Sequence, residues 1–397
     1  MPVSFSALPE ILPEPAKPKK SRWLLIIPGV LWVISYGLGR FFPLRQVLGE
    51  AWFLLLTVIL PLFIGLILYG IRLWIYENRR DYVQQWNETR RVTEEKLVRQ
   101  GQKSIGVLSL AYHTAAANNK LADVLLQGGK ALAPVYHAQN ERVEYYSQLQ
   151  PAPVTKSLDE YRQRLGLHLG QVLSSLTNEY LNQPCRLRIR HDGSLADSQV
   201  LEILHPLLQK EQIPVNGVIF DEDADGLLWI DKWLDSDTTP PLTLSIEIQF
   251  HVSPLPFIAE SVSAILFAKN SWCDQQGVTP LADVHRPVEL SARSGALEDL
   301  LLFGKVTPPA SLFLWQSPSD QEPLVGVLSE LDSHGINVTA HQHAIGQSLG
   351  VPGVAVGSLA LVCAVEHLRS SRQKQLILLQ DHAFQGCVVR AHREQDK

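Results

Sequence analysis

The sequence holds a single methionine, and its four cysteines are too few and too scattered for a disulfide framework. They stand at positions 185, 273, 363 and 387, without the paired spacing of a structural zinc site. Charged residues make up only 19 % of the chain and hydrophobic residues 46 %, which excludes a disordered protein. Unpaired cysteines in an ordered chain favour a reducing compartment.

An excess of basic charge is lacking from most of the chain. The formal net charge is −5, yet the first hundred residues hold 13 basic and 8 acidic residues, whereas the remainder holds 22 and 32. Phosphate contacts dominate the affinity of proteins for nucleic acid. The acidic remainder therefore argues against nucleic acid as a partner.

Two runs almost without charge stand near the amino terminus, after a proline-rich segment at residues 1–22 that we expect to be a flexible tail. Residues 23–38 carry no charge, and residues 52–76 carry only Arg72. A bilayer span needs about 20 apolar residues. The second run has this length, and the first reaches it if the side chain of Arg40 extends to the membrane interface. We predict a two-helix transmembrane hairpin over residues 23–76, with buried core helices as the alternative.

Aromatic and basic residues indicate how this hairpin would be anchored. The expected anchor residues are Trp23, Trp32, Trp52, Trp74, Arg79 and Arg80. Basic residues precede the first run and follow the second, whereas the connecting loop holds only Arg40 and Arg45. By the positive-inside rule, both termini and the soluble body face the cytoplasm.

The rest of the chain has the pattern of a spacer followed by an α/β body. Residues 77–100 are charged and free of proline and glycine, which predicts a solvated juxtamembrane helix. From residue 101 to 397, short apolar runs alternate with amphipathic stretches, which predicts a layered α/β body, with two halves at 101–250 and 251–397. The strands at 185–190 and 242–251 alternate polar and apolar residues, so we expect each to have one solvated face.

No metal or cofactor site is expected. Residues 221–226 match the first half of a calcium loop, but Lys232 occupies the position of the bidentate glutamate, so an acidic surface turn is the better interpretation. The histidines at 334, 341 and 343 lack the i, i+4 spacing of a zinc pair. Glycines at 346, 350, 353 and 357 surround a helix start. They would either expose backbone N–H groups to an anion or let the helix pack closely on the sheet.

The segment from Gln342 to Val354 runs into a long helix and holds glycines at 346, 350 and 353. It resembles the Lys-x-x-x-Gly-His-Thr-Leu-Gly-x-x-Gly motif of the ketosynthase branch of the thiolase superfamily, and the resemblance covers residues 255–392. Residues 259–268 resemble its Gly-Glu-containing strand, and residues 381–386 resemble its closing Phe-Gly-Gly turn. The family's His-Gly-Thr-Gly-Thr motif should lie near residues 314–319 but is not present there.

The resemblance implies a thiolase-like body that has lost its chemistry. The motif's lysine falls at Gln342 and its catalytic histidine at Gln347, while Phe384 stands in the degenerate closing turn. Condensation needs a thiolate and imidazoles that polarise the thioester carbonyl, and glutamine cannot carry the proton. No nucleophilic cysteine can be placed in the shorter amino-terminal half. We expect no catalytic residue and no enzymatic activity.

An inactive thiolase-like body behind a membrane segment is similar in layout to a bacterial family of adaptors for type VI secretion lipase effectors. That resemblance implies a cytoplasmic-face scaffold at the inner membrane, whose partners are a secreted effector and its spike protein. Thiolase-like bodies are usually dimers, so a homodimer is also implied. The alternatives are an acyl-thioester-binding or hydrolysing enzyme, and an immunity protein for a secreted toxin.

Overall fold

A computed structural model describes residues 8–17, 19–41, 51–52, 55–137, 141–155, 157–176, 183–222, 225–236, 239–291, 295–317, 321–338 and 341–392. The chain divides into two compact units, one over Ser4–Leu97 and a larger one that takes in Val98–Lys397. Parts of the expected amino-terminal tail, the loop with Arg45 and two residues of the expected second span lie outside the described residues.

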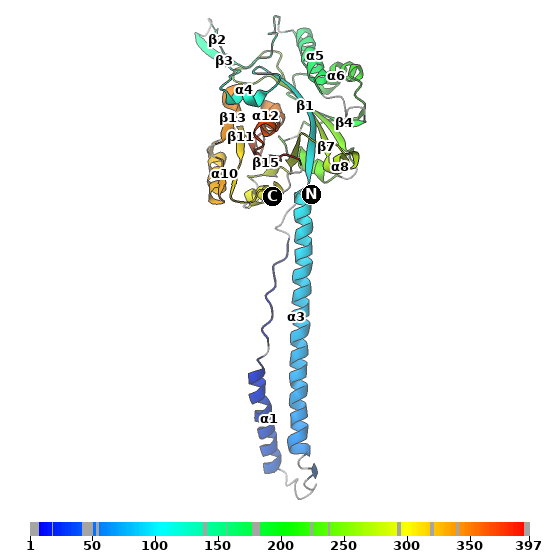
Figure 1. Cartoon of the computed structure of the whole chain (residues 1–397), viewed down its shortest axis with the longest axis vertical. Helices are drawn as coiled ribbons and strands as arrows, with labels where there is room; N and C mark the ends of the chain where they lie inside the picture. Colours follow the sequence, from blue (N-terminus) through cyan, green and yellow to red (C-terminus); the bar gives the residue numbers. More distant parts are fainter. Residues whose placement is uncertain are drawn as a thin grey trace. The chain divides into compact units, whose positions relative to one another are not determined.

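The smaller unit is a helical hairpin (Figure 1). Its elements are α1 (Lys20–Phe41), the π-helical turn η2 (Leu55–Ile59) and α3 (Leu60–Gly101), whose last turn belongs to the larger unit. Gly65 lets the two helices approach, because a Cβ there would lie 3.2 Å from Ile27. The rings of Trp23 and Tyr69 meet edge to face at 5.6 Å. The two apolar runs of the sequence thus pack on each other.

An extended segment before α1 is fixed along the charged part of α3. The side-chain amide of Asn87 donates to Leu12 O, and its Oδ1 accepts from Leu12 N, both at 3.0 Å. Arg90 Nε donates to Pro9 O at 2.8 Å. These bonds satisfy backbone groups that a proline-rich segment could not pair in a helix or sheet.

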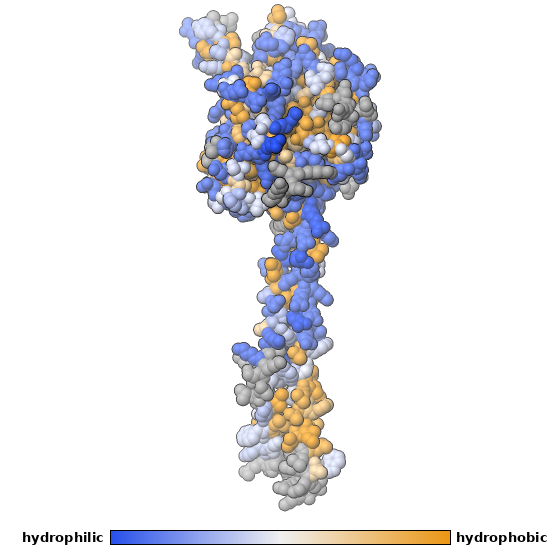
Figure 2. Space-filling view, in the orientation of Figure 1, coloured by the Kyte–Doolittle hydropathy of each residue, from blue (hydrophilic) through white to orange (hydrophobic). Residues whose placement is uncertain are grey.

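The apolar part of α3 is exposed. Phe63 is 61 % exposed and Trp74 64 %, and Figure 2 shows hydrophobic residues gathered over this end of the helix, with hydrophilic residues along the rest. Among the described residues, only Gly353–Ser371 forms a helix both long and apolar enough to cross a bilayer, and it is 67 % buried; Ile26–Gly37 is a shorter apolar helix. The longer helix is a core element of the body.

The larger unit is built on a mixed eleven-stranded sheet. The described strands of this unit are β1 (Ser104–Thr114), β2 (Ala133–His137), β3 (Arg142–Tyr146), β4 (Cys185–His191), β5 (Val215–Phe220), β6 (Leu242–Gln249), β7 (Ser261–Lys269), β8 (Ala282–His285), β9 (Val288–Glu289), β10 (Ala310–Ser311), β11 (Phe313–Ser317), β12 (Ile336–Asn337), β13 (Gln342–Ala344), β14 (Gln375–Gln380) and β15 (Phe384–Arg390). Strands β2 and β3 form one separate pair and β10 and β12 another, and the other eleven strands form the main sheet. Its order is β13-β11-β14-β15-β8-β1-β7-β6-β4-β5, and β9 also pairs with β15.

Helices cover both faces of this sheet (Figure 1). They are α4 (Leu121–Leu126), α5 (Leu158–Ser174), α6 (Asp197–Lys210), α7 (Trp229–Leu234), α8 (Asn270–Gln276), α9 (Ala296–Phe303), α10 (Gln321–Ser333), α11 (Ile345–Leu349), the 3-10 turn η4 (Gly353–Ala355) and α12 (Val356–Ser371). One apolar core joins α4, α7 and α12 to one face, and a second joins α5 and α6 to the other. The layered α/β body predicted from the sequence is therefore correct.

The expectation that β4 and β6 each have one solvated face is wrong. Arg188 and Arg190 on β4 are only 3 % and 4 % exposed, and Glu247 and Gln249 on β6 only 2 % and 4 %. The apolar residues of these strands pack toward α5 and α6, so the polar residues face the opposite layer. They are buried there against ion-pair and hydrogen-bond partners.

A small hairpin of β2 and β3 stands apart from the main sheet (Figure 1). The backbone amide of Phe257 donates to Tyr145 O at 2.8 Å, which ties the hairpin to the body. Tyr136 is 63 % exposed and Val143 53 %. The hairpin follows α4, which ends at Leu126.

Candidate functional site

The carboxyl ends of two neighbouring strands and a glycine-rich loop enclose a cavity of about 440 Å³. Strands β11 and β14 are parallel and in register, with Gln316 opposite Leu378, so the residues that follow them meet at one edge of the sheet. The cavity is lined by Gln316, Ser317, Gln321, Ala344, Gly346, Gln347, Val351, Pro352, Gly353, Val356, Gln380 and Asp381. Such an edge is where α/β folds usually bind ligands.

The structure brings one of the three degenerate motif positions into this cavity. Gln347, on α11, is exposed and lines it. Gln342 is exposed at the start of β13, outside the lining. Phe384, at the start of β15, is 3 % exposed and packs in the core, and its backbone oxygen accepts from Leu290 N at 2.8 Å.

Among the described residues of the lining, the one that carries a charge, Asp381, is already paired. Its Oδ2 lies 2.6 Å from Arg190 Nη1 and accepts from Gly226 N at 2.9 Å. Arg190 also donates to Val354 O at 3.0 Å. The Arg190 side chain is 4 % exposed, so the pair is desolvated and joins β4 to two loops of the carboxyl-terminal part. This carboxylate is engaged in a structural contact.

Backbone amides around the start of α12 already donate hydrogen bonds to side chains of the protein. Gln249 Oε1 accepts from Val354 N at 2.8 Å, and Glu247 Oε2 accepts from Ser358 N at 3.2 Å. The carboxylate of Glu247 is favourably placed at a helix N-terminus. Gly353 has a φ of 56°, and a Cβ there would collide with Gln249, so close packing explains this glycine. An anion would have to displace these bonds.

None of the described residues in the cavity lining is a histidine or a cysteine. His343, which directly precedes Ala344 of the lining, lies 3.2 Å from Ser348 Oγ and packs against Trp315. Burial lowers the pKa of His343, which keeps its ring neutral near pH 7. Ser348 is 7 % exposed, so this pair is part of the packed interior beneath the cavity lining.

All four cysteines are buried and unpaired. Burial raises the pKa of Cys185 and of Cys273 to about 11, and it raises the pKa of Cys363 and Cys387 as well. Cys363 stands inside α12 rather than at its start. A nucleophilic cysteine needs a lowered pKa and access to substrate, and these thiols have neither.

The expected membrane anchor residues lie on the smaller unit. Trp32 is 69 % exposed and stacks on Tyr36 at 5.6 Å, while Trp52 is 59 % exposed. Arg79 is exposed on α3, and Arg80 donates to Asp81 at 2.9 Å. Within the described residues, no group of three or more histidine, cysteine or acidic side chains could hold a metal ion.

Sequence reasoning missed the buried polar layer that borders the cavity. Its signal was present, because arginine recurs at every second position from 186 to 190 and polar residues alternate from 243 to 249. Alternation alone does not distinguish a solvated face from one that meets polar partners.

No protein-family model matches the sequence, and no curated protein matches it. Among solved structures, ketosynthase twelve of the bacillaene polyketide synthase of Bacillus amyloliquefaciens is similar, with a TM-score of 0.53, 10 % identity and 75 % of each chain covered. A type II polyketide synthase ketosynthase, solved in complex with its acyl carrier protein, gives a TM-score of 0.51 at 11 % identity, over 73 % of this chain and 100 % of that one. The body thus has the thiolase-like fold of ketosynthases.

Proposed function

We propose that this chain is a non-catalytic scaffold on a thiolase-like fold, anchored in the bacterial inner membrane, that binds a protein partner on the cytoplasmic side. The observation that carries the proposal is the cavity beside Gln347. Its lining holds amides, a hydroxyl and a paired carboxylate where condensation would need a thiolate and imidazoles. The four buried thiols agree with this assignment.

The anchor is assigned to residues 23–76. In support, large apolar side chains of α3 are exposed over two turns and more: Leu62, Phe63, Ile64, Leu66, Ile67, Leu68, Ile71, Trp74 and Ile75. Exposing so many apolar residues to water is unfavourable, whereas lipid would cover them. The charged stretch that follows holds several ion pairs, such as Arg91–Glu95 at 3.0 Å. Such pairs are typical of a helix surrounded by water.

The protein-binding surface is assigned to the β2–β3 hairpin. Exposed apolar side chains gather there and at the loop bonded to it: Val135, Tyr136, Val143, Tyr145 and Phe257. Tyrosines on a projecting hairpin bring large contact area and a hydrogen-bonding group, which is typical of protein interfaces. The partner that the adaptor resemblance implies is a lipase effector of the type VI secretion system, together with its spike protein.

Binding is tested with the full chain in detergent, tagged and incubated with a lipase effector and a spike protein of the kind that the adaptor resemblance implies. We expect the wild type to retain the effector and Tyr136→Ser to lose most of it. The matched control is Val325→Ser on α10, because Val325 is 62 % exposed and Tyr136 63 %. If the wild type retains neither protein, the scaffold proposal fails. If both variants bind equally, the hairpin assignment fails.

Anchoring is tested separately, by washing membranes at alkaline pH and by protease treatment of inverted and right-side-out vesicles. We expect the chain to stay with the membrane, and protease to reach the body only in inverted vesicles. Release of the chain by the wash would contradict the anchor without affecting the scaffold role.

The cavity itself favours one alternative, an acyl-thioester-binding or hydrolysing enzyme. Its volume of about 440 Å³ is enough for a small acyl group. A chloroacetyl thioester that labels ketosynthase nucleophiles discriminates the two functions. Covalent labelling of the folded chain would favour the enzyme, and its absence alongside labelling of an active ketosynthase favours the scaffold.

A further inference from the structure

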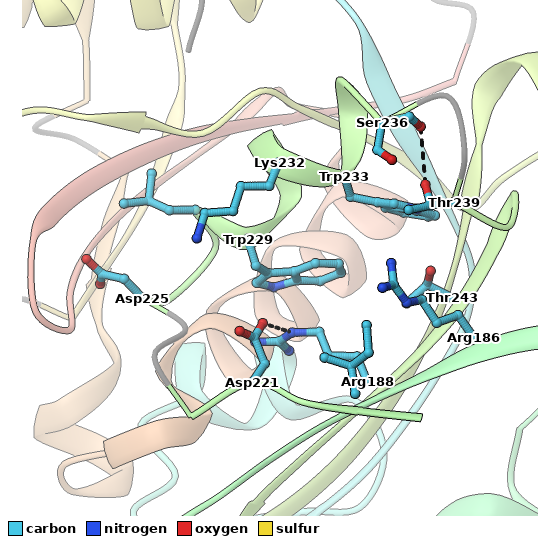
Figure 3. A pocket seen from close by; sticks show the side chains of 12 residues that line it. Arg186, Arg188, Asp221, Asp225, Trp229, Lys232, Trp233, Ser236, Thr239 and Thr243 are labelled. Carbon is cyan, nitrogen blue, oxygen red and sulfur yellow. Dashed lines mark hydrogen bonds and ion pairs between the residues drawn. The ribbon is translucent and has the colours of Figure 1, made fainter. Parts of the chain in front are cut away.

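A second cavity, of about 410 Å³, lies on the polar face of β4 and β6. Helix α7 covers it from the opposite side (Figure 3). Its lining is Arg186, Arg188, Ile219, Asp221, Asp225, Leu228, Trp229, Lys232, Trp233, Ser236, Thr239 and Thr243. It shares no lining residue with the cavity beside Gln347.

Two tryptophans form an aromatic wall of this second cavity. Trp229 and Trp233 are four residues apart on α7, so they share a helix face, and their rings stack at 6.1 Å with an angle of 25°. Arg188 lies with its Cζ 4.4 Å from the Trp229 ring centre. Trp229 is half-buried and lines the cavity, so part of its surface is open to an occupant.

The carboxylates of the lining are engaged within the protein. Asp221 Oδ2 accepts from Arg188 Nε at 2.8 Å. Asp225 accepts from the backbone amides of His382 and Ala383 at 3.1 and 2.9 Å. Both negative charges are therefore directed away from an occupant.

Two positive charges of the lining are left for an occupant. No described carboxylate forms an ion pair with Arg186 or Lys232. Lys232 is exposed, and Arg186 is half-buried opposite Thr243 in the strand register. Figure 3 shows the guanidinium group of Arg188 against the ring of Trp229, with Arg186 on the neighbouring part of the lining.

Three buried donors on lining residues also lack a hydrogen-bond partner among the described residues. They are Arg188 Nη2, Trp233 Nε1 and Thr243 Oγ1. Buried donors without partners destabilise a fold by about 1–3 kcal/mol each, so such groups usually have a role that offsets this cost. All three are able to donate to an oxygen acceptor.

We propose that this cavity binds an oxyanion carried on a flat, apolar ring system, that is, an aromatic carboxylate or an aromatic phosphate. The ring would lie against the indole of Trp229, and the oxyanion would accept from the accessible cations Arg186 and Lys232. This site does not depend on the scaffold proposal, because it lies outside the cavity beside Gln347 and outside the β2–β3 hairpin.

The test is isothermal titration of the full chain in detergent with three probes of one ring system: 2-naphthoate, 2-naphthyl phosphate and the neutral 2-naphthalenemethanol. We expect one or both anions to bind at least about tenfold more tightly than the alcohol, since charge-assisted hydrogen bonds contribute about 1.5–3 kcal/mol. The tighter of the two anions then identifies carboxylate or phosphate as the group recognised.

Variants locate the binding. Arg186→Gln should lower the affinity for the anion about tenfold and leave the affinity for the alcohol unchanged. Lys210→Gln on α6 should change neither affinity. Lys210 is a suitable control because its side chain is 73 % exposed, far from this lining. The same two affinities are measured for Lys232→Gln, which removes the second positive charge of the lining, at an exposed position. Equal affinity for anions and alcohol, or equal effects of Arg186→Gln and Lys210→Gln, would overturn the proposal.

Discussion

Replacing Glu260 with glutamine should remove a pH-dependent cost from the folded state. Glu260 stands before β7 and is 1 % exposed. Its Oε2 accepts from Leu149 N at 2.9 Å and lies 3.7 Å from Arg164 Nη2. Despite these contacts, burial raises the pKa of Glu260 from 4.5 to about 7. Glutamine keeps the acceptor for Leu149 and cannot ionise.

The sign and size of the effect follow from proton linkage. A carboxyl group whose pKa is raised by folding stabilises the fold below pH 4.5, and this contribution is lost as the pH rises through about 7. A shift of this size corresponds to about 3 kcal/mol. The free energy of unfolding of the wild type, relative to Glu260→Gln, should therefore fall by about 3 kcal/mol across this interval.

The contribution of buried His168 to stability changes with pH in the opposite direction to that of Glu260. The effect of Glu260 must therefore be measured by comparing variants. Burial lowers the pKa of His168 from 6.5 to about 4, and its contribution to stability is lost as the pH falls through this range. The two groups partly cancel in the wild-type profile. Subtracting the Glu260→Gln profile isolates the glutamate, because His168 is present in both proteins.

The assay is urea denaturation of the full chain in detergent, followed by tryptophan fluorescence between about pH 4.5 and pH 8. Glu202→Gln on α6 is the control, because Glu202 is exposed. We expect its difference from the wild type to stay constant with pH. A constant difference for Glu260→Gln as well would refute the assignment of a raised pKa to this carboxyl group.

Three further substitutions or treatments test the packing of the body. Gly353→Ala should destabilise the fold by about 1–3 kcal/mol in urea denaturation, because Gly353 has a φ of 56° and a Cβ there would collide with Gln249. Gly346→Ala is the control and should change the stability little, because a Cβ at Gly346 meets nothing within 4 Å. Ser157→Ala should cost about 1 kcal/mol by the same assay, since Ser157 Oγ caps α5 by accepting from the next turn's amide at 3.2 Å. Iodoacetamide should modify the four buried cysteines only in denaturant, as measured by intact mass; fast modification of the native chain would contradict their burial.

Periodicity was enough to predict much of the body. Helices such as α9 over Ala296–Phe303 and strands such as β5 over Val215–Phe220 alternate along the chain, as the predicted α/β pattern requires. The serine cap of α5 was also predictable, because Ser157 and Glu160 have capping-box spacing and the serine accepts from the Glu160 amide. These features depend on residues close in sequence, which is why a single sequence reveals them.

Features that depend on distant residues could not be predicted in this way. The side chain of Arg188 is buried because Asp221 and Glu247 meet it, and neither partner is visible from the local pattern. The cavity beside Gln347 is likewise assembled from separate loops. The motif resemblance did locate Gln347, but it gave no sign that Phe384 lies in the core away from that cavity.

The buried polar layer of β4 and β6 has a consequence for how the body folds. Arg190 donates to Val354 O, 164 residues later in the chain, and Glu247 accepts from Ser358 N, 111 residues later. During synthesis these two hydrogen bonds cannot form until the segment from Gly353 to Ser371 has been made. Such long loop closures slow folding, and the incomplete sheet is open to aggregation in the meantime. We therefore expect slow, late completion of the body, with a dependence on chaperones that local helices alone would not impose.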